Sequence, residues 1–216
     1  WFSGDEASLF DALPEYLKRI DTLVGELRDN GLCADLAGIS ARSRAMLTCY
    51  PGGGAHYVRH CDNACDSGAG ERCNGRRLTA ILYLNQGWGT ADGGELRIYP
   101  RGDAHGDAPR AVIEPRADRL LLFFADHRCP HEVAPTHAER FAITTWFFDG
   151  DEHGRARRGG RAADEVSAEE RQAIDREIAR FEARYGARAK IIAAAAASAG
   201  SGDDRNGPGA SDAGGG

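Results

Sequence analysis

Seven short runs rich in β-branched and aromatic residues follow one another between residues 45 and 148. Clusters of glycine, proline and aspartate separate these runs, and apolar residues recur mainly at every second position within them. Strands at such short intervals predict a sandwich or barrel of the jelly-roll kind. The runs are AMLTCY, AHYVRH, LTAILYLN, GELRIYP, RAVIEP, RLLLFFA and FAITTWFF.

Helical patterns flank this β-rich region on both sides. Residues 13–30 carry one apolar stripe at helical spacing, and Gly31 follows them as a typical helix stop. We expect this helix to pack on the outside of the strands. A second helix is predicted over about residues 168–188, where Ser167 and Glu170 form a capping box.

Composition narrows the classes of protein that the chain can belong to. Its 216 residues are 42% hydrophobic and carry a net charge of −6, which suits one domain with a substantial core. The mild acidity argues against a nucleic-acid partner. The sequence contains no apolar run of about 18 residues, so we expect no membrane partner. The six cysteines lack the short spacing of a zinc knuckle, so we expect free thiols in a reducing compartment.

Two histidines and one aspartate form a candidate metal site. His60 and Asp62 lie one residue apart near the end of a predicted strand, where alternation points both side chains one way and Cys61 the other. His131 follows the run RLLLFFADHRCP. Two histidines and one carboxylate are the ligand set that holds non-haem ferrous iron and leaves positions open for a cosubstrate and dioxygen.

An arginine completes the pattern, because Arg140 opens the last run nine residues after His131. A guanidinium group binds a carboxylate with two parallel hydrogen bonds, so Arg140 is a candidate for the far carboxylate of a keto-diacid chelated to iron. Thr144 and Trp146 share its strand face, and Tyr83 can add a hydroxyl to the same carboxylate. In the run LTAILYLN, one strand face carries Thr79, Ile81, Tyr83 and Asn85.

Each of these elements has an ordinary alternative. A His-x-Asp pair alone is usually a surface pair, and a lone strand arginine usually belongs to a surface ion pair. Tyr83 and Trp146 would by default be core or rim aromatics. Their joint occurrence, in this order and within one β-rich region, favours the metal site.

At this point the residues resemble a known family. The stretches CYPGGGAHYVRHCDN, RRLTAILYLNQGW, GGELRIYP, DRLLLFFADHRCPHEV and ERFAITTWFFD are similar to the 2-oxoglutarate- and Fe(II)-dependent prolyl hydroxylases of the oxygen-sensing, hypoxia-inducible-factor type. The resemblance implies a mainly β, cupin-like double-stranded β-helix with flanking helices. It also implies a prolyl 4-hydroxylase that acts on a proline-containing protein or peptide in the cytoplasm and/or nucleus. Its implied cofactors are Fe(II), 2-oxoglutarate, dioxygen and ascorbate.

Carried over residue by residue, the resemblance assigns roles to individual side chains. His60, Asp62 and His131 would ligate iron, while Arg140 and Tyr83 would bind the distal carboxylate of 2-oxoglutarate. The positions implied to line the cosubstrate and substrate pocket are Tyr50, Ile81, Leu96, Thr144 and Trp146.

Other positions match the family less closely. Tyr57 and Arg76 correspond to positions near the substrate proline, although strand alternation places Tyr57 opposite His60. Cys61 stands where the family usually has an apolar residue, and the loop at 63–75 is longer than its family counterpart. We expect Cys65 and Cys73 to share that loop, and their reversible oxidation is a hypothesis for regulation.

The resemblance also predicts the organisation of the chain. Residues 1–155 form the dioxygenase domain, 156–192 a connector and C-terminal helix, and 193–216 a disordered tail rich in Ala, Gly, Ser and Asp. In the family an extra segment precedes this region, so we expect a fold that lacks its N-terminal segment. Two alternatives stay open: the same chemistry on a non-prolyl or small-molecule substrate, and a non-catalytic binding module that keeps the fold.

Overall fold

The computed structural model describes residues 12–63, 73–101 and 108–158, and all of them belong to one compact unit of the chain. The helix predicted at 168–188 and the predicted tail at 193–216 lie outside the described residues. None of the helices in the described ranges is long and apolar enough to cross a membrane.

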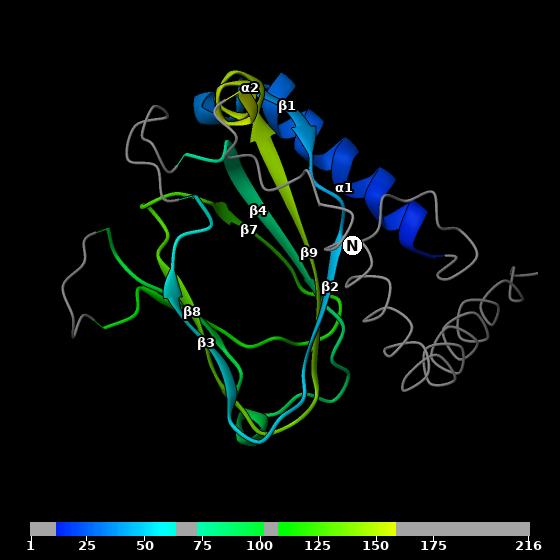
Figure 1. Ribbon diagram of the computed structural model, residues 1–216. Helices are drawn as coiled ribbons and strands as arrows, with labels where there is room; N and C mark the ends of the chain where they lie inside the picture. Colours follow the sequence, from blue (N-terminus) through cyan, green and yellow to red (C-terminus); the bar gives the residue numbers. More distant parts are fainter. Residues whose placement is uncertain (1–11, 64–72, 102–107, 159–216) are drawn as a thin grey trace, which may run out of the picture. The chain divides into compact units, whose positions relative to one another are not determined.

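Two antiparallel sheets contain the nine strands of the described ranges, and they form the two layers visible in Figure 1. The larger sheet has the order β1-β9-β4-β7, with β2 also paired to β9, and the smaller sheet has the order β3-β8-β5-β6. This arrangement confirms the predicted jelly-roll class. The strands are β1 (Ile39–Arg42), β2 (Met46–Tyr50), β3 (Ala55–His60), β4 (Arg76–Tyr83), β5 (Leu96–Ile98), β6 (Ala111–Ile113), β7 (Leu120–Phe124), β8 (His131–Thr136) and β9 (Arg140–Asp149).

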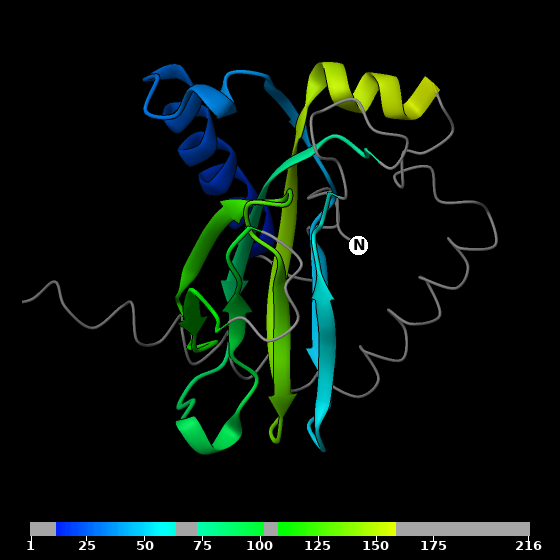
Figure 2. The same ribbon diagram turned by 90° about the vertical axis from the view of Figure 1, so that its left-hand side faces the viewer.

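Helix α1 (Ala12–Asp29) confirms the first predicted helix and covers the outer face of the larger sheet. It ends where Gly31 adopts a φ of 63°, a left-handed conformation that favours glycine. The short 3-10 helices η1 (Ala34–Leu36) and η2 (Thr90–Asp92) lie in connections. Helix α2 (Gly150–Arg158) continues directly from the end of β9 (Figure 2).

Strand β4 separates two cores because its alternate side chains face opposite sides of the larger sheet. Leu78 and Ala80 pack against α1 in a helix-side core. Ile81 and Tyr83 point between the two sheets into an inner core, as the alternation of LTAILYLN predicts. The members of the inner core that come from the smaller sheet are Leu96, Ile98 and Val133.

Three elements differ from the expectation drawn from the sequence. Strand β8 contains Pro135, which has no backbone N–H to donate and weakens the strand pattern, but its carbonyl accepts a bond from Gly94 N. Strand β1 is only four residues long. Helix α2 replaces part of a predicted connector: it lacks an apolar stripe, but the Asp149 carboxylate caps it by accepting from the N–H groups of Asp151 and Glu152.

Candidate active site

His60, Asp62 and His131 converge between the two sheets. His60 ends β3 and His131 begins β8, and the two residues are partners in the ladder that joins these strands. Their imidazole centroids lie 4.4 Å apart. One ligand atom from each of the three side chains lies within 4.8 Å of the other two, so the group has the size of a metal site.

Backbone carbonyls orient both imidazole rings. Nδ1 of His60 lies 2.9 Å from Val58 O, and Nδ1 of His131 lies 2.9 Å from Cys129 O. A carbonyl only accepts, so each Nδ1 carries the proton and each Nε2 keeps its lone pair. Nε2 of His60 is 3.5 Å and Nε2 of His131 is 3.8 Å from the Asp62 carboxylate, on the side where a metal would sit.

Asp62 lies two residues beyond the end of β3, so hydrogen bonds rather than strand alternation fix its side chain. Thr79 Oγ1, on the inward face of β4, donates to Asp62 Oδ2 at 2.6 Å. Burial raises the pKa of Asp62, but His60, His131, Thr79 and Trp146 outweigh burial and lower the pKa to about 2. The carboxylate is therefore ionised at neutral pH, as a metal ligand requires.

The two histidines differ in their surroundings. Burial lowers the pKa of His131 below its ordinary value, although the charge of Asp62 acts in the opposite direction. Burial also lowers the pKa of His60, but hydrogen bonds to Asp62 and to the Val58 carbonyl outweigh it and raise the pKa overall. His131 is therefore held neutral, the form that binds a metal.

Arg140 forms the second half of the site as a buried cation. It is 2% exposed, and its Nε donates to Gly94 O at 2.8 Å. No carboxylate of the described residues forms an ion pair with it, and its guanidinium lies 5.1 Å from the ring centroids of both Tyr50 and Tyr83. A buried arginine in this state suits a carboxylate guest, because an unpaired buried charge is costly.

The Tyr83 hydroxyl supports the same conclusion. It is buried, and no group of the described residues meets it with hydrogen-bond geometry. Burial raises the pKa of Tyr83 to about 12, although the charge of Arg140 lowers it. The phenol is therefore a neutral donor that is available to a guest carboxylate beside Arg140.

The remaining predicted pocket residues lie along the same strands. Tyr50 is the ladder partner of Arg140, and Ile81 is the partner of Thr144. Leu96 is 1% exposed and packs in the inner core between the sheets.

Tyr57 and Arg76 lie at the other side of the metal site. The Tyr57 ring contacts the His60 imidazole edge-on with centroids 4.7 Å apart, so the expectation that Tyr57 points away from His60 is wrong. The β3–β8 register shifts between Tyr57 and His60, and this irregularity breaks strict alternation. Arg76 places its guanidinium 4.0 Å over the ring of Trp146, next to Asp62.

Comparison with known proteins agrees with this geometry. Residues 45–148 match the family model described as 2OG-Fe(II) oxygenase superfamily. A Trichoplax adhaerens prolyl hydroxylase, solved in complex with a peptide fragment of the hypoxia inducible factor oxygen degradation domain, has a TM-score of 0.59 and 36% identity; the match covers 72% of this chain and 64% of that one. Residues 45–148 thus carry a 2OG-Fe(II) oxygenase domain.

Curated relatives of this oxygenase carry related names. Egl nine homolog 1 of Rattus norvegicus is 40% identical over 164 residues, which is 73% of this chain and 42% of that protein. Prolyl hydroxylase EGLN3 of Homo sapiens is 40% identical over 162 residues, which is 73% of this chain and 60% of that protein. The oxygenase chain thus spans about 42% to 60% of the length of these two relatives.

The oxygenase domain matched over residues 45–148 implies Fe(II) and 2-oxoglutarate, and the residues fit both. The Nε2 lone pairs of His60 and His131 and the ionised Asp62 suit Fe(II), and the uncompensated Arg140 beside the unpaired Tyr83 hydroxyl suits a dicarboxylic acid. Cys61 is outside the ligand group of the described residues.

Two contacts at the oxygenase site have no signal in the sequence: the bond from Thr79 to Asp62 and the packing of Phe123 on His131. Thr79 was placed on the correct face of β4, but its bond to Asp62 needs the three-dimensional position of the loop after β3. Phe123 lies edge-on to His131 with centroids 4.8 Å apart, and no local pattern distinguishes it from its neighbours in LLLFF.

Among the described residues, no cysteine belongs to the candidate metal-ligand group. Among the described residues, no disulfide joins Cys33, Cys49, Cys61, Cys73 or Cys129 to another of these five. Cys73 is buried and contacts Asn63 and Glu152, whereas Cys65 lies outside the described residues. The expectation that Cys65 and Cys73 share a loop, and the hypothesis of their reversible oxidation, therefore stay predictions.

Proposed function

We propose that this chain hydroxylates a prolyl residue of a protein substrate at carbon 4, with conversion of 2-oxoglutarate and dioxygen to succinate and carbon dioxide. The observation that carries the proposal is the position of the His60, Asp62 and His131 group in the same inter-sheet space as a buried, uncompensated Arg140. The names of the relatives support proline as the target, and the peptide held by the Trichoplax hydroxylase supports a protein substrate.

When bound, Fe(II) and 2-oxoglutarate supply the oxidation of an unactivated C–H bond by dioxygen. The chain's own residues position these groups. His60, Asp62 and His131 would hold the metal, each through one ligand atom. Arg140 and Tyr83 would hold the distal carboxylate of 2-oxoglutarate.

Tyr57, Arg76 and Trp146 supply the surface that meets the substrate. Tyr57 is 51% exposed beside His60, and Arg76 lies against the buried Trp146. An aromatic ring and a stacked guanidinium next to the metal site suit a peptide that brings an apolar pyrrolidine ring toward the metal with polar backbone groups around it.

One experiment tests the reaction. The purified chain is given Fe(II), 2-oxoglutarate, ascorbate and proline-containing peptides, and succinate release and the gain of one oxygen atom on proline are measured. His131→Ala should abolish both signals because it removes a metal ligand. The matched control is His56→Ala, which removes an exposed histidine from the same strand pair and should keep full activity.

The readout separates the open alternatives. Succinate release with a small molecule, but with no peptide, would assign the same chemistry to a different substrate class. Absence of succinate with any substrate, together with retained metal binding, would identify a binding module. Either result would contradict the prolyl hydroxylase proposal.

The proposal extends to regulation and location. Ascorbate would keep the iron in its Fe(II) form, so omission of ascorbate should shorten the period of linear turnover. A role in oxygen sensing requires that the rate follow dioxygen concentration across the physiological range, and a rate saturated throughout would oppose that role. We also propose a cytoplasmic and/or nuclear location, which imaging of the tagged protein tests.

A further inference from the structure

Two asparagines, Asn63 and Asn74, fix the chain segment that carries Asp62. Asn74 Nδ2 donates to Asp62 O at 2.8 Å, and Asn74 N donates to Asn63 Oδ1 at 3.3 Å. Asn63 Nδ2 donates to Arg76 O at 2.8 Å, and Asn63 N donates to Ala125 O at 2.7 Å. Asp62 is outside any strand, so these bonds hold its backbone where regular pairing does not.

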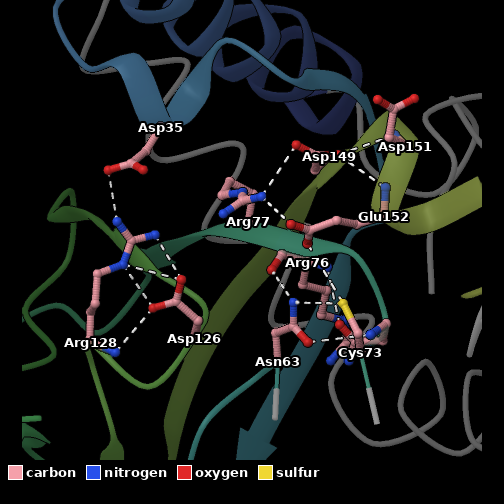
Figure 3. Close-up of polar contacts among 11 residues, drawn as sticks. Asp35, Asn63, Cys73, Arg76, Arg77, Asp126, Arg128, Asp149, Asp151 and Glu152 are labelled. Atoms are coloured by element: carbon pink, nitrogen blue, oxygen red, sulfur yellow. Dashed lines mark hydrogen bonds and ion pairs between the residues drawn. The ribbon is translucent and has the colours of Figure 1, made fainter. Parts of the chain in front are cut away.

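A chain of buried polar contacts runs from Asn63 through Cys73 to Glu152 on α2 (Figure 3). Asn63 Nδ2 lies 3.8 Å from Cys73 Sγ, and Cys73 Sγ lies 3.7 Å from Glu152 Oε2. The other Glu152 oxygen accepts from Arg77 Nη2, which also lies 3.3 Å from Asp149 Oδ2. Asn63, Cys73 and Glu152 are each less than 8% exposed, so removal of one member leaves a buried polar group without its partner.

The backbone of α2 meets residues 73–77 at close range. Gly75 has a φ of 82°, and a Cβ at this position would lie 2.6 Å from the backbone of His153. His153 Nδ1 lies 3.3 Å from Asn74 O, and the His153 ring stacks on Phe148 with centroids 4.2 Å apart. The first turn of α2 is therefore seated directly on the residues that hold the Asp62 segment.

We propose that Glu152 is a positioning residue for the metal ligand Asp62. It acts by fixing Cys73 and Arg77, which in turn fix Asn63, Asn74 and the Asp62 backbone. Glu152 itself does not belong to the ligand group. This inference rests on the proposed metal site and adds α2, which lies outside the residues matched to the family model, to the machinery of that site.

Metal binding, measured without turnover, tests the proposal. Mn(II) serves as a redox-stable probe, and its dissociation constant is measured by titration of the metal-free protein. Outer residues that orient metal ligands typically change affinity by about 10-fold to 100-fold, so Glu152→Ala should weaken Mn(II) binding by about 10-fold. In the metal-free protein the Asn63 amide, bonded to Ala125 O, should exchange its hydrogen faster in this variant.

Two further variants separate positioning from general destabilisation. Glu152→Gln keeps the side-chain shape and an acceptor for Arg77, so it should restore part of the lost affinity. Val24→Ala removes buried atoms from the helix-side core and should lower Tm without changing the Mn(II) constant. The KM for 2-oxoglutarate, which depends on Arg140, should stay unchanged in Glu152→Ala when iron is saturating.

The outcomes are distinct. Wild-type Mn(II) affinity and wild-type Asn63 exchange in Glu152→Ala would overturn the positioning role while leaving the proposed function intact. Equal loss of affinity in Val24→Ala and Glu152→Ala at equal Tm would also overturn it. A wild-type chain that binds no Mn(II) would instead overturn the proposed metal site, and the positioning role with it.

Discussion

His60 and His131 are ladder partners on neighbouring strands, and each ring turns its Nδ1 toward a carbonyl of its own chain segment two residues earlier. Both carbonyls therefore impose the same tautomer, with the free Nε2 lone pair directed to the same space. Two strands of the smaller sheet thus present one site, while the larger sheet contributes Thr79 and Arg140 from the opposite side.

The hydroxyl of Thr79 is expected to strengthen metal binding through Asp62. Thr79→Val keeps the size of the side chain but removes the donor to Asp62 Oδ2, so metal affinity should fall by about 3-fold to 10-fold. Titration with Mn(II) measures the change. Thr79→Ser should restore affinity, and Thr145→Val, on the other face of the larger sheet, should have no effect. Unchanged affinity in Thr79→Val would contradict this role.

Arg140 and Tyr83 are expected to control binding of 2-oxoglutarate. Tyr83→Phe removes one hydrogen bond and should raise the KM for 2-oxoglutarate by about 3-fold to 10-fold. Arg140→Lys keeps the charge but loses the planar fork, so its KM should rise by about 10-fold or more. Steady-state kinetics measure both. Tyr16→Phe, in contact with the helix-side core, is the matched control and should leave KM unchanged.

The conformation of Gly94 is expected to fix Arg140. Gly94 has a φ of 69°, and a Cβ there would lie 3.0 Å from both Arg140 Cδ and Thr136 Cβ. Gly94→Ala should lower the free energy of unfolding by about 1 kcal/mol through backbone strain, and it should also raise the KM for 2-oxoglutarate. Gly53→Ala separates the two effects, because Gly53 has a φ of 64° but no atom within 4 Å of the added Cβ. It should destabilise the chain and leave KM unchanged; equal KM values for the two variants would refute the role of Gly94.

The Asp126–Arg128 pair is expected to make stability depend on pH. Burial raises the pKa of Asp126, but hydrogen bonds from the Arg128 side chain and backbone N–H outweigh it and lower the pKa below 3.8. A lowered carboxyl pKa adds stability that is fully present above the unfolded value and is lost as pH falls through the folded value. Asp126→Asn should therefore reduce the free energy of unfolding at pH 7 by about 1–3 kcal/mol.

Urea unfolding at several pH values measures this dependence. The difference between wild type and Asp126→Asn should shrink as the pH drops below 3.8, where the wild-type carboxyl gains its proton. A difference that stays constant as the pH falls further below 3.8 would show that the loss comes from packing and not from the ionised carboxylate.

The sequence predicts the strands of the site better than the loops between them. Alternation in LTAILYLN correctly places Ile81 and Tyr83 in the inner core, because buried strand faces repeat every second residue. The same rule fails for Tyr57, where the register shifts beside His60. A bulge of this kind depends on the partner strand, β8. The sequence does not predict β8 as a strand, because Pro135 interrupts its strand pattern.

The contacts that hold Asp62 could not be predicted from local patterns. Asn63 and Asn74 are ordinary loop residues in the sequence. The hydrogen bonds that Asn74 donates to Asn63 Oδ1 and Asp62 O depend on how the chain segments before and after residues 64–72 meet in space. Glu152 lies on a helix with no apolar stripe, so neither its burial nor its contact with Cys73 has a sequence signature.

Because the two faces of β4 pack in different cores, substitutions on one face can alter folding stability without altering the side chains of the candidate site on the other face. Leu78 and Ala80 pack against α1, whereas Thr79, Ile81 and Tyr83 face the space between the sheets that holds the proposed metal and cosubstrate sites. Mutations at every second position of one strand can thus be selected for robustness, and those between them for substrate or cosubstrate preference. An engineer who seeks a more heat-resistant variant should begin on the helix-facing positions, where a repacked side chain need not disturb the reaction.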